Sequence, residues 1–93
     1  MNKEVKKKWV KALLSGKYEQ GVGFLCRGGR WCCLGVAHKV ITGEQPRPLW
    51  SIDYCPRPDP KTFIPIAVAD KLADLNDAGV PFDMIAGLID EAL

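Results

Sequence analysis

The sequence predicts a small single domain of the α+β class over residues 1–93. Apolar residues recur at helical spacing near both ends of the chain, whereas a glycine-rich stretch between them has the pattern of short strands. A proline-rich segment separates this stretch from the C-terminal third. A chain of this length can build one modest core, which excludes a doubly wound sheet or a two-domain cleft and with them most large enzyme classes.

The first expected element is an amphipathic helix over Asn2–Ser15. Its apolar residues fall on one face while its lysines fall elsewhere. Asn2 suits the start of this helix, and Gly16 suits its end because glycine adopts the left-handed conformation without a Cβ clash.

A β-hairpin of two short strands is expected within Gln20–Cys33. Gly28 and Gly29 supply the positive φ values that tight hairpin turns require. A short buried helix is expected next, over Leu34–Ile41, closed by Gly43.

The remainder of the chain is expected to form a proline-rich loop followed by a helical hairpin. Residues 44–65 hold six prolines, which exclude a helix and most central strands. Trp50 and Tyr54 are among the side chains that can anchor this loop. Pro65 opens a helix that we expect to run to about Leu75, and turn residues from Asn76 to Gly79 separate it from a last helix that begins at Pro81 or Phe82 and ends near Ala92.

The net charge of +2 conceals an uneven distribution. Residues 1–61 carry 12 Lys and Arg against 5 Asp and Glu, whereas residues 62–93 carry one Lys against 6 acids. Such a chain suits a phosphate-bearing ligand or an acidic partner protein at its basic half, or a homo-oligomer that packs basic half on acidic half. No apolar run is long enough to span a membrane. We expect a cytoplasmic protein without a membrane partner.

Four cysteines and one histidine raise the question of metal or thiol chemistry: Cys26, Cys32, Cys33, Cys55 and His38. Five residues separate the first two cysteines and the next two are adjacent, which differs from the usual zinc knuckle. Cys32 and Cys33 lie at the start of an expected helix, where the helix dipole lowers the pKa of a thiol. No Asp or Asn is placed by the sequence to orient His38 as a base for such a thiol. We therefore expect neither a metal, nor a cofactor, nor catalysis, and keep zinc binding as an alternative.

An anion site at the hairpin is a further candidate, and a hairpin tip that is merely solvated is the alternative. Arg27 and Arg30 flank the glycine turn, and Lys7 and Lys11 can approach from the first helix. Trp31 can stack on a base or on a partner. The last helix carries no Lys or Arg, so we do not expect a helix-turn-helix motif that binds DNA. A role as a nucleic-acid-binding accessory protein stays an alternative.

Several sequence blocks resemble those of an uncharacterised family of small proteins encoded by bacteriophages and prophages. The blocks are Trp9-Val10-Lys11-Ala12-Leu13, Ser15-Gly16-Lys17-Tyr18, Gln20-Gly21, Cys32-Cys33-Leu34-Gly35-Val36, and Leu75-Asn76-Asp77 with Gly79, Phe82, Ile85-Ala86 and Ile89. In relatives the block that corresponds to Cys32–Val36 tends to continue with a further Cys and an acid. This chain has Ala37-His38-Lys39 at that place. The resemblance implies an accessory protein that acts stoichiometrically on a bacterial host.

These observations together predict a non-enzymatic binding protein of phage type. We expect an inhibitor or sequestering module that acts on a bacterial defence component or on a defence signalling nucleotide. The residues expected to contact the ligand or partner are Lys7, Lys11, Arg27, Arg30, Trp31, Trp50 and Tyr54.

Overall fold

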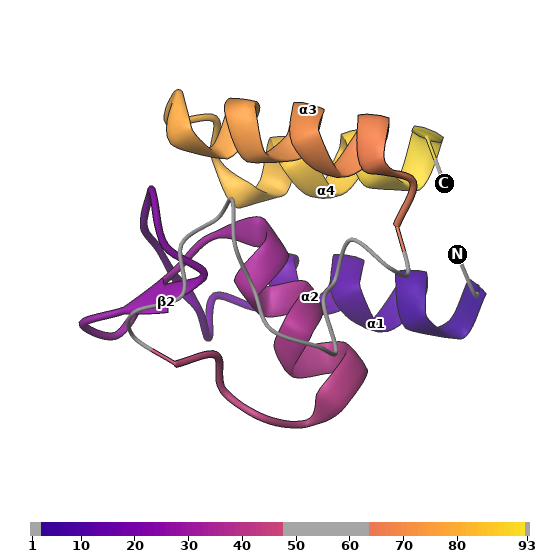
Figure 1. Cartoon of the computed structure of the whole chain (residues 1–93). Helices are drawn as coiled ribbons and strands as arrows, with labels where there is room; N and C mark the ends of the chain where they lie inside the picture. Colours follow the sequence, from indigo (N-terminus) through magenta and orange to yellow (C-terminus); the bar gives the residue numbers. More distant parts are fainter. Residues whose placement is uncertain (1–2, 48–63, 93) are drawn as a thin grey trace.

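The computed structural model describes residues 3–47 and 64–92. Asn2, Trp50, Tyr54 and Cys55, to which the sequence analysis assigned roles, lie outside the described residues. The elements follow the expected α+β order and are α1 (Lys3–Leu14), β1 (Glu19–Gln20), β2 (Cys26–Arg27), β3 (Arg30–Trp31), α2 (Cys33–Thr42), α3 (Ile66–Asp77) and α4 (Phe82–Ala92) (Figure 1).

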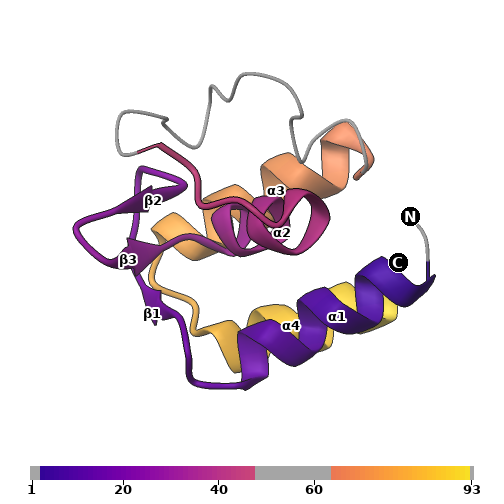
Figure 2. The ribbon, with the colours of Figure 1, turned by 90° about the horizontal axis from the view of Figure 1, so that it is seen from below.

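The four helices pack in a closed cycle, in which α1 contacts α2 and α4, and α3 contacts the same two helices. Seen from below, α1 lies beside α4 and α2 lies over α3 (Figure 2). The small sheet sits at one end of this arrangement. At the other end, Lys6 of α1 and Asp90 of α4 form an ion pair of 3.8 Å between Nζ and Oδ1.

The sheet has three strands in the order β1-β3-β2. The antiparallel β2-β3 hairpin turns at Gly28 and Gly29, whose φ values of 60° and 79° confirm the expected glycine turn. The parallel strand β1 was not expected, because two residues are too few to show an alternating pattern. The Gly21 N–H continues this pairing by donating to the Trp31 carbonyl over 2.7 Å.

Helix α2 forms the centre of the core. Six successive residues of this helix, from Cys33 to His38, are buried, so its N-terminal part is enclosed on every side, whereas residues 39–42 are partly exposed. Cys32 caps its start, since the Cys32 Sγ accepts a hydrogen bond of 3.2 Å from the Gly35 N–H. Gly43 ends it as expected, at φ 77°, and donates its N–H to the Lys39 carbonyl over 2.8 Å. The other buried side chains come mainly from α1, α3 and α4 and include Trp9, Leu13, Leu72, Phe82, Ile85 and Ile89.

Helix α3 extends two residues beyond the expected end at Leu75. The expectation that Asn76 and Asp77 belong to the turn was wrong, because both lie inside the helix. Asparagine is a poor helix former in isolation, but here its side chain makes long-range hydrogen bonds that outweigh the local preference.

Candidate functional site

The hairpin tip presents two arginines directly opposite each other. Arg27 and Arg30 are cross-strand partners in the β2-β3 register, and both are exposed. Side chains that are paired in this way lie on one face of the strands, where like charges repel and destabilise the pair. The register therefore places two cationic side chains next to each other at the tip, with Glu19 opposite Arg30 on its other side.

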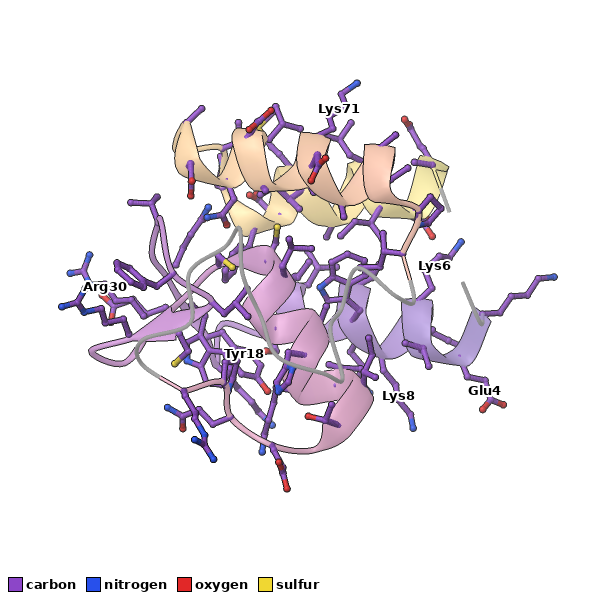
Figure 3. The ribbon with its side chains drawn as sticks, in the orientation of Figure 1. Glu4, Lys6, Lys8, Tyr18, Arg30 and Lys71 are labelled. Carbon is purple, nitrogen blue, oxygen red and sulfur yellow. The ribbon has the colours of Figure 1, made fainter. Side chains whose placement is uncertain are left out.

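Neighbouring groups orient both guanidinium groups without neutralising the tip. The Arg27 guanidinium lies over the Phe24 ring, 4.5 Å from its centroid. The Arg30 Nη2 lies 3.7 Å from the Glu19 Oε1, and both side chains are mostly exposed, so this ion pair is weak. Two cations and one anion leave the tip with a net positive charge. Figure 3 shows Arg30 pointing outward at this end of the molecule.

A hollow of about 300 Å³ adjoins the two arginines. Its lining consists of Gln20, Gly21, Val22, Phe24, Arg27 and Arg30. Guanidinium groups recognise phosphate and carboxylate oxygens through paired N–H donors, and the Phe24 ring adds an apolar wall. No side chain of this lining is a nucleophile or a general base. The arrangement is suited to binding an anion.

Of the other predicted contact residues, the structure describes Lys7, Lys11 and Trp31, and none of these three lines the hollow. Lys7 and Lys11 line a separate hollow of about 440 Å³ along α1, together with Glu4 and Lys8. Trp31 is half-buried against the core, and its ring packs edge to face with Tyr18 at 4.8 Å between centroids. The structure thus groups the two arginines and does not place the two lysines in the same hollow.

The described cysteines are packed in the interior. Burial raises the pKa of the Cys32 thiol to about 12, and burial together with the neighbouring Cys32 raises the pKa of Cys33 further. The suggestion that the helix dipole lowers these values was wrong, because the loss of hydration dominates. Burial likewise raises the pKa of Cys26, whose Sγ accepts from the Gln45 Nε2 over 3.4 Å. Within residues 3–47 and 64–92 no three Cys, His, Asp or Glu side chains gather as metal ligands, and His38 is buried in α2.

Sequence reasoning missed a buried polar junction around Asn76. This side chain is fully buried, and its Oδ1 accepts from the Cys33 N–H over 3.1 Å. Its Nδ2 donates to the Gly21 carbonyl over 2.8 Å, and the Gln20 Nε2 approaches the same Oδ1 at 3.4 Å. We call Gln20, Asn76 and the groups they bind the Asn76 junction.

Gln20 connects this junction to the last helix. Its Nε2 donates to the Val80 carbonyl over 2.6 Å, and its Oε1 accepts from the Phe82 N–H over 3.1 Å at the start of α4. Trp9 reaches the same region, since its Nε1 donates to the Cys33 carbonyl over 2.9 Å. Four of the blocks singled out in the sequence meet here, which gives them a structural role. The signal in the sequence was that Gln20-Gly21 and Leu75-Asn76-Asp77 belong to the blocks that carry the resemblance described above.

A comparison with models of protein families places most of the helices and strands described above within one family. A family model described as "Domain of unknown function (DUF8296)" matches residues 1–55. The chain belongs to this family. The matched residues include α1, the three strands and α2, so the arginine tip lies within the DUF8296 region. No curated protein and no solved structure matches the chain. None of the described helices is long and apolar enough to cross a membrane.

Proposed function

We propose that this DUF8296 protein is a non-enzymatic accessory binding protein of bacteriophage type. It inhibits or sequesters its target stoichiometrically, and the target is a component of bacterial defence or the nucleotide that signals in such a system. The observation that carries this proposal is the exposed pair of Arg27 and Arg30 beside a hollow.

The energetics of the hairpin tip support a binding role for these arginines. Two like charges placed directly opposite each other lower the stability of a hairpin. A bound phosphate would remove this repulsion, because it carries negative charge and accepts several N–H donors at once. The hollow beside the arginines is large enough for a phosphate with part of the group that carries it.

The bacteriophage setting rests on the resemblance of the sequence blocks. Small phage accessory proteins commonly act by covering or sequestering a host component, which requires no catalytic residues. The positive balance of residues 1–61 favours an acidic or phosphate-bearing target and steers its approach. A nucleotide and an acidic face of a defence protein share the anionic chemistry that the tip recognises.

Binding measurements with a matched pair of variants test this proposal. We expect a panel of labelled mononucleotides and cyclic dinucleotides to include a ligand that binds the full chain. The double variant Arg27→Ala/Arg30→Ala should weaken this binding by about tenfold or more, whereas Lys7→Ala/Lys11→Ala removes the same charge and should have a much smaller effect. Equal losses in both variants would show that overall charge, and not the hairpin tip, governs binding. Cooperative thermal unfolding, at a melting temperature no lower than that of the natural chain, confirms that both variants are folded.

If no nucleotide binds, cross-linking in a bacterial lysate tests the protein target. A photo-reactive residue in place of Val22, which is 58% exposed and lines the hollow, should capture a bacterial protein. Capture that persists in the Arg27→Ala/Arg30→Ala background would contradict the proposed site.

A further inference from the structure

A second surface of the molecule carries an apolar groove between α3 and α4. The groove has a volume of about 480 Å³. Val68, Leu72 and Leu75 of α3 and Leu88 of α4 line it, with Lys71 and Glu91 at its margins. In Figure 3 Lys71 points away from α1 and α2, so this side of α3 faces outward from the helix cycle.

Exposed apolar side chains extend the groove along α4. Leu88 is 39% exposed and Met84, one helical turn earlier on the same face, is 61% exposed. Large apolar side chains that lie together on a surface mark an interaction site more often than single scattered ones do. Methionine adapts its shape to different partners because its side chain is unbranched and flexible.

The charge around the groove indicates what can cover it. Helices α3 and α4 carry six acids against the single Lys71. Glu91 lines the groove, and Asp74 is exposed three residues after Lys71, on the adjoining side of α3. The border of the groove therefore carries Glu91 and Asp74 against the one Lys71, which gives it a net negative charge. An apolar strip with such a border complements a helix that has apolar residues on one face and lysines or arginines beside them.

The length of the groove fits a short helix. The α3 residues that line the groove run from Ala67 to Leu75, which corresponds to about 12 Å at the usual rise per residue. A partner helix of about two turns therefore places apolar residues at i, i+4 and i+7 along the strip. We propose that the α3–α4 groove binds a basic amphipathic helix of a partner protein. This site is separate from the arginine tip, and the inference does not depend on the proposed function.

Titration of the full, isotope-labelled chain with a peptide probe tests this inference by NMR. The probe is a synthetic helix of about 18 residues, long enough to be partly helical alone, with leucines at i, i+4 and i+7 and lysines beside them. We expect shifts of amide signals confined to α3 and α4. A scrambled peptide of the same composition and a version with glutamate in place of lysine should bind about tenfold more weakly or not at all.

Two surface variants provide the matched controls. Leu88→Gln should weaken binding of the probe by about tenfold, whereas Leu14→Gln, at an exposed leucine of α1, should leave it unchanged. The Arg27→Ala/Arg30→Ala variant should also bind the probe normally, which separates this site from the hairpin tip. Shifts outside α3 and α4, equal binding of the scrambled peptide, or no binding at about 1 mM peptide would overturn the inference. Shifts in α3 and α4 that grow with protein concentration alone would show that a second copy occupies the groove, and would also overturn it.

Discussion

At the scale of single residues, buried polar groups hold the elements of this protein together. Asn76 offers one acceptor and two donor hydrogens in the interior, and backbone groups of α2 and of the residue after β1 pair with it. An unpaired buried amide or carbonyl costs more than its hydrogen bond contributes, so the partners of Asn76 depend on it. The sequence predicted Asn76 as a turn residue, because asparagine favours turns and its distant partners leave no local pattern.

Replacement of Asn76 by alanine should therefore destabilise the whole domain. We expect Asn76→Ala to lower the free energy of unfolding by about 2 to 4 kcal/mol, since it leaves the Cys33 N–H and the Gly21 carbonyl without this partner. Asp74→Ala, at an exposed position of the same helix, should change it by less than about 0.5 kcal/mol. Urea denaturation followed by tryptophan fluorescence measures both, and similar values for the two variants would contradict a central role for the junction.

The buried thiols make the stability depend on alkaline pH. Burial raises the pKa of Cys32 from 9.0 to about 12, so the folded thiol stays protonated where the unfolded thiol ionises. The contribution is fully present below pH 9 and is lost as pH rises through the folded pKa, with a slope of up to about 1.4 kcal/mol per pH unit.

Denaturation at several pH values above 9 tests this expectation. The Cys32→Ser variant keeps a side chain that can cap α2 but does not ionise in this range, so its stability should fall less steeply. Parallel pH profiles of the variant and the natural protein would show that Cys32 does not contribute.

At the scale of elements, those that follow a local sequence pattern were predicted, and those that depend on distant contacts were not. Apolar spacing predicted α1, α2 and α4 to within one or two residues, and the glycine turn predicted the β2-β3 hairpin. Strand β1 depends on pairing with β3, and the extra length of α3 depends on Asn76, so neither was visible in local sequence. Close packing of elements was equally hidden, because glycine disfavours a helix locally, whereas the fold requires Gly35 inside α2.

Gly35 and Gly87 give a prediction that separates packing from helix propensity. Both lie inside helices, but a Cβ at Gly35 would overlap the Leu25 carbonyl group, with the carbonyl carbon at 2.6 Å, whereas a Cβ at Gly87 meets nothing within 4 Å. We expect Gly35→Ala to destabilise the domain by about 1 to 3 kcal/mol or more. Gly87→Ala should stabilise it by up to about 1 kcal/mol.

Thermal unfolding followed by circular dichroism measures both alanine variants. An increase in melting temperature for Gly35→Ala would show that α2 and the chain before β2 do not pack as closely as described. Unchanged stability of Gly87→Ala would indicate that its helix position is not fully formed.

At the scale of the whole molecule, charge and structure divide the chain in the same way. The basic residues 1–61 include the arginine tip, and the acidic C-terminal third supplies the two helices that form the groove. The sequence predicted the tip, because the arginines and the turn glycines are neighbours. The groove was not predicted, since its walls come from two helices whose relative placement is set by contacts with α1 and α2. The lysines of α1 were assigned to the tip on charge alone, and the fold places them along another hollow.

The binding role of the arginine tip is the central claim, and native mass spectrometry of protein purified from bacterial cytosol tests it most directly. The account predicts that the natural chain carries an additional mass, a phosphate-bearing ligand or a bacterial protein. It also predicts that Arg27→Ala/Arg30→Ala, purified in the same way and folded, loses this mass. The bare polypeptide mass for the natural chain, or the same additional mass on both proteins, would contradict it.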